Sequence, residues 1–297
     1  MNLIKPKKLQ HGSTISIIAP SGNVDKDKLE LGVNYLKNLG YKVKLGKNLF
    51  NQNRYLAGTD DERAFDINQA FADSNVDAII CARGGYGAIR LIDKLDFSII
   101  KNNPKIFCGY SDITAFSSII FKNTGLITFS GPMVQSDFSE NEINSFTAEN
   151  LWSTLKSDKI TISPNNAKFY SKGSAKGITI GGNLATIASL AGIDFIPDEK
   201  FIFFAEDINE TTYKIDKYFR QLLNIPDFKN NISAILLGDF IGIDNEEWLD
   251  DLFKELSEEL KIPVISGYSI SHSANKVTVP YGARATLNEN GEFEIIY

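Results

Sequence analysis

The stretch VDAIICARGGYG, residues 76–87, joins an apolar run to a glycine-rich turn. The β-branched run Val76–Ala82 predicts a buried β-strand. The turn that follows, Arg83–Gly87, holds three glycines, which let the backbone bend sharply where the strand ends. Ligands of open α/β sheets bind outside the carboxyl ends of the strands. The stretch therefore predicts both a fold class and a place for a functional site.

The same pattern of strand and helix extends over the first half of the chain. Apolar runs predict three more strands, at Thr14–Ala19, Ile106–Tyr110 and Ile127–Phe129. Helical spacing predicts helices at Lys26–Leu39 and Ile113–Lys122, and the capping-box sequence Thr59–Glu62 predicts a third that ends about Asp73. Such alternation predicts an α/β fold, with a parallel sheet covered by helices on both faces.

The length of 297 residues predicts two domains, at roughly 150 residues for each. The chain is polar and loses its alternation between about Ser139 and Gly177. We therefore expect an N-terminal domain over 1–150, a linker over 151–176 and a C-terminal domain over 177–297. In the last part, strands are expected near Ile178 and at Phe201–Ala205, Ala234–Leu237, Val264–Ser266, Val277–Val279, Arg284–Leu287 and Glu292–Ile296, and helices at Leu184–Leu190, Tyr213–Leu223 and Glu246–Leu260.

Composition and charge exclude several classes of protein. Lys and Arg number 31 against 37 Asp and Glu, a net charge of −6, which argues against a broad nucleic-acid surface. No apolar stretch approaches the ~20 residues that cross a bilayer. The two cysteines, Cys81 and Cys108, are too few for a disulfide scaffold, and we expect them to be buried free thiols. A soluble cytoplasmic protein with no membrane partner is expected.

A serine lies where the next predicted strand turns into a helix, in the sequence Gly109-Tyr110-Ser111-Asp112. This context is typical of a nucleophile elbow, in which the hydroxyl stands clear of the sheet and the next N–H faces a developing oxyanion. The alternative is that Ser111 is only a helix N-cap. The glycine-rich turn likewise has two interpretations: it could supply a second oxyanion N–H, or it could be merely a tight turn.

Two further signals are a scarce histidine and a pair of carboxylates. The chain has two histidines, His11 in a turn before the first strand and His272 in a polar loop after Val264–Ser266. His272 could be a base or a solvated loop residue. Glu206 and Asp207 end the apolar strand at 201–205, where they could orient a histidine or cap the next helix. The histidines and cysteines show no metal-ligand spacing, so we expect neither a metal nor a cofactor.

Together these motifs resemble the LD-carboxypeptidases, serine peptidases whose relatives include the microcin C immunity hydrolases. The similarity spans nearly the whole chain, from Ile17–Ser21 to Pro280–Gly282. The shared motifs in between are Arg83–Gly87, Gly109–Ala115, Gly181–Leu184, Glu206–Glu210 with Tyr213–Asp216, and His272. The resemblance implies a Rossmann-like N-terminal domain, a smaller β-rich α/β C-terminal domain, and an active site in the cleft between them.

The resemblance also implies roles for particular residues. Ser111 would be the nucleophile, His272 the general base and Glu206 the acid of a triad. The backbone N–H groups of Asp112 and Gly85 would form the oxyanion hole. Our candidates for contact with the substrate are Arg83, Asn183 and Tyr213; Arg83 could hold the terminal carboxylate or could instead form a structural ion pair.

The expected reaction is release of the terminal D-Ala from cytoplasmic murein tetrapeptides in peptidoglycan recycling. One alternative keeps the machinery but hydrolyses acyl-sulfamoyl or acyl-phosphoramidate adenylates, and a binding protein without catalysis is another. The expected partner is a small peptide, and the oligomeric state, monomer or homodimer, stays open. Three positions depart from the family pattern and bear on specificity: Ser130 replaces a histidine before Gly-Pro, Ser271 a glycine before His272, and Lys217 an arginine.

Overall fold

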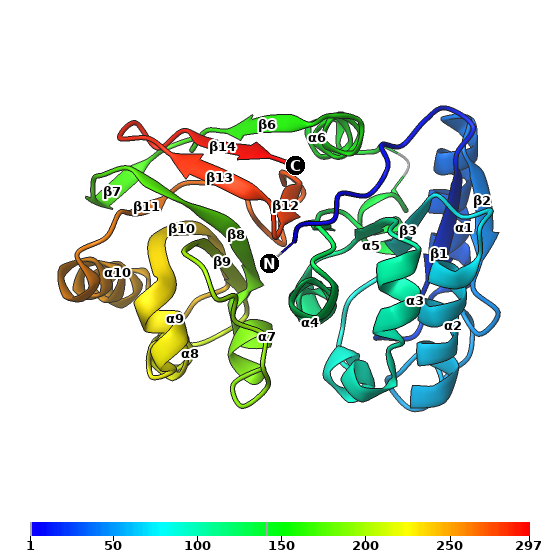
Figure 1. Cartoon of the computed structure of the whole chain (residues 1–297), viewed down its shortest axis with the longest axis horizontal. Coiled ribbons are helices and arrows are strands. Elements are labelled where there is room, and N and C mark those ends of the chain that lie inside the picture. Colours follow the sequence, from blue (N-terminus) through cyan, green and yellow to red (C-terminus); the bar gives the residue numbers. More distant parts are fainter. Residues whose placement is uncertain (1, 141) are drawn as a thin grey trace.

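A computed structural model describes residues 2–140 and 142–297. These residues form a six-stranded sheet and an eight-stranded sheet, with helices packed against both (Figure 1). The fold is α/β, as the alternation predicted. Within the described residues no helix is both long and apolar enough to cross a membrane.

The first sheet carries both glycine-containing turns. Its strand order is β12-β5-β4-β3-β1-β2. The strands from the first half of the chain pair in parallel, which confirms the predicted sheet, whereas β12 (Val279–Tyr281) pairs antiparallel with β5. The parallel strands are β1 (Thr14–Ile18), β2 (Lys42–Leu45), β3 (Ala78–Cys81), β4 (Ile106–Cys108) and β5 (Thr128–Ser130).

The helices of this half pack in two groups, α1 against α5, and α3 against both α2 and α4. The predicted capping box is confirmed, since Thr59 Oγ1 accepts from the Glu62 N–H at 3.3 Å and Glu62 accepts from the Thr59 N–H at 2.8 Å. The helices are α1 (Lys26–Asn38), α2 (Asp60–Ala72), α3 (Phe97–Asn102), α4 (Thr114–Thr124), α5 (Val134–Asp137) and α6 (Ser145–Lys156).

The second sheet has the order β6-β14-β13-β8-β9-β10-β11-β7. Its central strands β8 (Ala175–Asn183), β9 (Phe201–Ile208), β10 (Ile232–Ile241) and β11 (Val264–Ser266) are parallel. Antiparallel strands flank them: β13 (Arg284–Leu287), β14 (Phe293–Ile296) and β6 (Lys159–Ile162) on one side and β7 (Lys168–Ser171) on the other. The helices of this half are α7 (Leu184–Ser189), α8 (Thr212–Leu223), α9 (Pro226–Asn231) and α10 (Glu246–Leu260).

The segment 151–176, expected to be a linker, is folded. It holds the end of α6 and the strands β6 and β7, which form the two edges of the second sheet. The linker prediction is therefore wrong for this segment. Edge strands have few neighbours, so most residues of β6 and β7 are not buried, and their polar sequences resemble loops.

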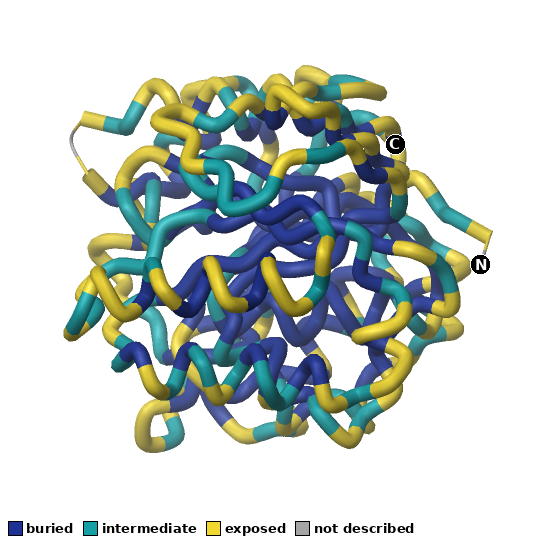
Figure 2. Tube along the Cα trace, turned by 90° about the vertical axis from the view of Figure 1, so that its left-hand side faces the viewer, coloured by how far each residue is buried: buried dark blue, intermediate teal, exposed yellow. Residues whose placement is uncertain are grey.

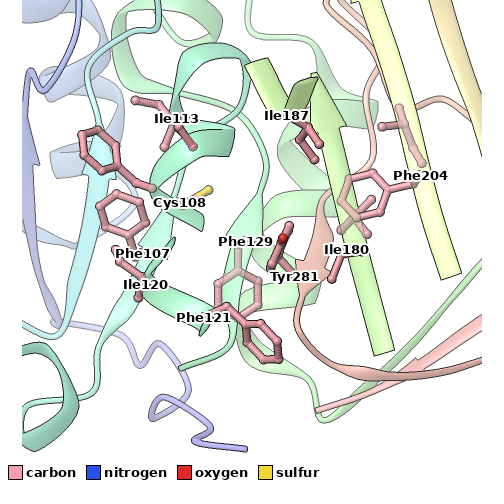
Figure 3. Packing of buried hydrophobic residues seen from close by; sticks show 14 of the residues in the cluster. Phe107, Cys108, Ile113, Ile120, Phe121, Phe129, Ile180, Ile187, Phe204 and Tyr281 are labelled. Carbon is pink, nitrogen blue, oxygen red and sulfur yellow. The ribbon is translucent and has the colours of Figure 1, made fainter. Parts of the chain in front are cut away.

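Buried apolar residues of both halves belong to one cluster. Buried residues fill the interior of the molecule, and exposed residues lie mostly at its outside (Figure 2). Tyr281 of β12 lies between the two halves, with its ring 5.9 Å from Phe121 of α4 and 6.4 Å from Phe204 of β9 (Figure 3). Its hydroxyl lies 3.1 Å from Ser118 Oγ. The helix that follows Ser111 is therefore packed against the second sheet. Cys81 and Cys108 are buried and free, as predicted.

Candidate active site

The nucleophile candidate Ser111 lies in a tight turn between β4 and α4. Its φ angle is 63°, in the left-handed region that residues other than glycine rarely adopt. The turn leaves no space for a side chain at Gly109, where a Cβ would lie 2.8 Å from Ile113 Cγ2. The surrounding backbone therefore holds Ser111 in the strained conformation of a nucleophile elbow.

The structure does not use Ser111 as a helix cap. The short 3₁₀ turn η2 (Ser111–Ile113) and α4 both begin without a side-chain cap. Within residues 2–140 and 142–297, the Ser111 hydroxyl has no hydrogen bond to His272 or to any other group. Catalytic hydrogen bonds are often long without substrate and tighten when it binds. The hydroxyl is thus uncommitted to any structural role.

The glycine-rich turn after β3 lies against Ser111. A Cβ on Gly84 would lie 2.9 Å from Ser111 Cβ and 3.0 Å from its Oγ. The same Cβ would lie 3.6 Å from the backbone nitrogen of Asp112. Gly85 has a φ angle of 124°, which would strain any other residue. The predicted oxyanion donors, Gly85 and Asp112, therefore belong to two turns that meet at the Ser111 side chain.

The Asp112 carboxylate joins these turns to the first strand. It accepts hydrogen bonds from Ser21 Oγ at 2.6 Å and from the Ala88 N–H at 2.8 Å. Burial raises the pKa of Asp112, and the two hydrogen bonds oppose that rise. One side chain thus fixes the end of β1 and the glycine-rich turn beside Ser111.

Arg63 supports the glycine-rich turn from α2, and the sequence analysis did not identify it. Its buried guanidinium donates to the carbonyls of Pro20 and Gly87 and pairs with Asp60 at 2.6 Å. The sequence did contain a signal for this role: Arg63 precedes Ile67 by four residues, which places a charged residue on the same, apolar face of the helix. Charged residues are almost never fully buried unless they are paired, so that position indicates a buried network.

Replacing Gly84 by alanine is expected to lower kcat about 100-fold, because small displacements of reacting groups cost that much. The added Cβ would displace either Ser111 or the turn that supplies an oxyanion N–H. Steady-state kinetics on the substrate proposed below would measure the loss. Gly192→Ala is the control for a loss of stability alone: its φ angle of 100° strains an alanine and should lower Tm, but a Cβ there meets no atom within 4 Å. Equal kcat values in the two variants would show that Gly84 gives the nucleophile no necessary space.

The structure brings the acid and base candidates together. His272 Nδ1 lies 2.6 Å from Glu206 Oε2. Glu206 is 3% exposed, and its other oxygen, Oε1, has no partner among the described residues. The Tyr110 ring packs edge-on against the imidazole with centroids 4.9 Å apart. Because Tyr110 precedes Ser111, the Glu206–His272 pair lies beside the nucleophile turn.

The alternative interpretations of these two residues are wrong. The side chain of His272 is 13% exposed, so it is not a solvated loop residue. Glu206 is not a cap for the following helix, because β9 continues to Ile208. The Thr212 N–H at the start of that helix donates instead to Asp244 Oδ1 at 2.7 Å.

Asp207 and Asn183 form a separate polar cluster at the start of α7. Asp207 accepts from Asn183 Nδ2 at 2.8 Å and from the Ala185 N–H at 2.9 Å. Burial raises the pKa of Asp207 to about 6. Asn183 Oδ1 accepts from the Thr186 N–H at 3.0 Å, which makes Asn183 the helix cap. Asn183 was predicted to contact the substrate, but its amide nitrogen and its amide oxygen both make hydrogen bonds within the protein.

The other substrate-binding candidates lie apart from one another. Arg83 is partly buried, and its Nη1 donates to the Asn23 carbonyl at 3.3 Å. Tyr213 is 69% exposed and lines a hollow of about 300 Å³ with Trp248, between α8 and α10. The described residues that line this hollow include none of the triad candidates.

A larger hollow, of about 530 Å³, opens beside His272. Its lining includes the ion pair between Lys276 and Asp137, together with Glu140 and Glu142. Because Asp137 is paired with Lys276, the two glutamates leave this wall acidic. In the described part of the chain, no cluster of three or more His, Cys, Asp or Glu side chains could hold a metal ion.

Comparison with protein families matches most of the chain to two domains. Residues 15–131 match the LD-carboxypeptidase N-terminal domain, and residues 176–287 match the LD-carboxypeptidase C-terminal domain. The first match covers the Ser111 turn, and the second covers Glu206 and His272. The interval between them contains α6, β6 and β7.

Individual proteins are similar over nearly their full lengths. A probable murein peptide carboxypeptidase of Bacillus subtilis is 37% identical, over 96% of this chain and 91% of its own. The microcin C7 self-immunity protein MccF of Escherichia coli is 29% identical, over 93% of this chain and 91% of its own. The crystal structure of an MccF-like protein from Bacillus anthracis superposes with a TM-score of 0.92 at 30% identity, and the match covers 99% of each chain.

Proposed function

The chain belongs to the LD-carboxypeptidase family. We propose that it is a serine carboxypeptidase that releases the terminal D-Ala of murein tetrapeptides. As a member of a peptidase family it is a hydrolase. We place its work in the cytoplasm, in peptidoglycan recycling. The proposed reaction needs neither a cofactor nor a metal ion. Whether the protein is a monomer or a homodimer can be measured by light scattering.

The proposed mechanism uses Ser111, His272 and Glu206 as a triad. Ser111 Oγ attacks the scissile carbonyl, and its proton passes to His272 Nε2. The N–H groups of Gly85 and Asp112 stabilise the oxyanion that forms. Collapse of the intermediate breaks the C–N bond, and the imidazolium gives its proton to the amine of the departing D-Ala. A water molecule then hydrolyses the acyl-enzyme by the same steps.

The observation that carries this proposal is the 2.6 Å contact between Glu206 and His272 beside a strained serine. Glu206 lies on a strand of the second sheet, and Ser111 follows a strand of the first. A carboxylate on Nδ1 holds the imidazole with Nε2 available for the serine. A binding protein without catalysis would have no need of this arrangement.

The charge of the hollow beside His272 favours a peptide substrate. Glu140 and Glu142 would attract the ammonium group of the diamino acid in a murein peptide. The carboxylates of such a peptide, like the phosphate of an acyl-phosphoramidate adenylate, would have to lie away from this wall. We place murein peptides ahead of adenylates because the identity to a probable murein peptide carboxypeptidase, 37%, exceeds the 29% identity to MccF.

The alternative is hydrolysis of acyl-sulfamoyl or acyl-phosphoramidate adenylates, as the similarity to MccF suggests. Such a substrate needs an aromatic surface for its base, and Tyr213 with Trp248 offers one. Incubating the purified protein with a murein tetrapeptide and, separately, with a processed microcin C analogue decides between the two. Consumption of the analogue alone would replace our proposal by this alternative.

The enzyme is expected to cleave a tetrapeptide about 100-fold or more faster than the matched pentapeptide. A carboxypeptidase must pair the terminal carboxylate with donors, for which Arg83 or backbone N–H groups are the candidates. One further D-Ala would put a neutral amide in that place and would put a D-centre on the acyl side of the bond. Leaving a buried donor unpaired costs ~1–3 kcal/mol, and more for a charged donor.

The measurement is the rate of D-Ala release from the two peptides, with a C-terminally amidated tetrapeptide as the control. The amide keeps the stereochemistry and removes only the charge, so its rate isolates the contribution of the carboxylate. Similar rates on all three peptides would contradict recognition of the free carboxylate.

A further inference from the structure

A buried ion pair joins the two halves of the chain beside the candidate base. Lys276 Nζ pairs with Asp137 Oδ1, and the two side chains are 4% and 6% exposed. Asp137 Oδ2 also accepts from the Met133 N–H at 2.8 Å. Lys276 follows His272 by four residues, whereas Asp137 ends α5. A buried pair repays little of its desolvation cost, so stability alone does not explain why it lies here.

The loop that carries His272 makes further hydrogen bonds to α6 and its cap. Thr147 Oγ1 accepts from the Lys276 N–H at 2.9 Å and donates to the Ala274 carbonyl. Asn144 Nδ2 donates to Asn275 Oδ1 at 2.7 Å. The base candidate is thus tied to the half of the chain that holds Ser111, although it comes 161 residues later in the sequence.

Tyr110 connects the ion pair to both catalytic candidates. Lys276 Nζ lies 4.7 Å from the centroid of the Tyr110 ring, and the ring packs edge-on against His272. Burial, with Asp137 and Glu206 nearby, raises the pKa of Tyr110, so its phenol stays neutral. The side chain beside the nucleophile therefore contacts a lysine and the candidate base at once.

Lys276 is also placed to act on the charge of the Glu206–His272 pair. It lines both the large hollow, together with His272, and a water-sized hollow, together with Glu206. It is the one lysine or arginine among the described residues that line either hollow. The charged or titratable groups around His272 are Glu206 on β9, Asp239 on β10, Tyr110, Asp137, Lys276, Glu140 and Glu142.

We propose that Lys276 and Asp137 are positioning residues for the triad. The ion pair fixes the His272 loop against the Ser111 turn, and its two opposite charges act on the imidazole in opposite directions. This inference rests on the proposed function. It adds a pair of residues that set both the geometry and the working pH of the base.

The charges predict opposite effects for the two single variants. The base must be neutral, and a nearby positive charge disfavours its protonated form. Lys276→Met leaves Asp137 unbalanced, so the pKa of His272 should rise and the acidic limb of kcat/KM should move up by about 0.5–1 pH unit. Asp137→Asn leaves the lysine unbalanced, so the limb should move down by a similar amount.

The double variant separates charge from position. Lys276→Met with Asp137→Asn removes both charges, so the acidic limb should return to its original pH. Because the ion pair is still missing, kcat should stay about tenfold below that of the unchanged protein, while KM changes little. Lys276→Arg keeps the charge and should preserve the limb. If the ion pair had only a structural role, all these variants would be less stable, and the acidic limb of the kcat/KM profile would stay at its original pH.

Lys105→Met is the matched control. Lys105 is also a buried lysine, and it donates to the Val76 carbonyl at 2.8 Å. It precedes β4, at the end of that strand opposite Ser111. We expect this variant to lower Tm without moving the acidic limb.

The pKa of His272 can also be measured without any substrate. The chain has two histidines, so ¹³C-histidine labelling gives two titrating signals, and His11→Gln assigns them. Opposite shifts of the His272 pKa in the two single variants would support the proposal even if no murein peptide is cleaved. Shifts in the same direction, or none beyond those of Lys105→Met, would overturn it whatever the substrate proves to be.

Discussion

Ser111→Ala is expected to lower kcat by about 10⁴-fold or more and to leave the fold intact. The Ser111 hydroxyl has no hydrogen bond among the described residues, so its removal breaks no structural contact. Alanine keeps the Cβ that the 63° φ angle already accommodates. The whole loss should therefore appear in turnover, with Tm and the circular dichroism spectrum unchanged.

The control for this variant is Ser117→Ala, six residues further along the chain. Ser117 is a buried residue of α4 whose hydroxyl also lacks a partner in the described part of the chain. Its loss should leave kcat within a factor of about two. If the two variants have similar kcat values, Ser111 is not the nucleophile.

Glu206→Gln is expected to lower kcat by roughly 10³–10⁴-fold, the cost of a wrong histidine tautomer in a triad. The 2.6 Å contact lets His272 Nδ1 donate its N–H to Glu206 Oε2, which leaves the lone pair of Nε2 free to take the serine proton. A glutamine could turn its amide N–H toward Nδ1 and favour the other tautomer. It also could not stabilise the imidazolium. The effect should appear in kcat, because Glu206 is too buried to contact substrate directly.

Asp207→Asn tests whether the acid is assigned to the right neighbour. Asp207 faces the start of α7, where it holds Asn183 and the Ala185 N–H. An amide can replace only part of those contacts, so we expect a lower Tm and less than a tenfold loss of kcat. A larger kcat loss than that of Glu206→Gln, in a folded protein, would move the acid to Asp207.

The elements that could be predicted from the sequence are those whose burial leaves a pattern. The strands at Ala78–Cys81 and Phe201–Ala205 are buried on both faces, so their apolar residues are continuous and the strands could be predicted. The edge strands β2 and β7 were missed because each has only four residues, none of them buried, so neither forms an apolar run. Their strand conformation comes from pairing with neighbours that are distant in sequence.

The residues of the candidate site also differ in how far the sequence alone could identify them. Ser111 could be found locally, from a strand, a turn and a helix. Glu206 and His272 lie 66 residues apart, and only the family resemblance connected them before the structure did. Lys276 and Asp137 are 139 residues apart and belong to no local motif, so their pairing needed the folded chain. Residues whose role lies in joining two segments leave little signal in either segment alone.

The pairing of β12 with β5 has a consequence for the synthesis of this protein. Val279 pairs with Ser130, so the β5 edge of the first sheet stays unpaired until residues 279–281 emerge from the ribosome. At roughly 5–20 residues per second, the interval between residues 130 and 281 lasts on the order of 8–30 s. An open sheet edge is a template for aggregation during that time. The first sheet is therefore complete only after residues 279–281 have been made, well after its other five strands.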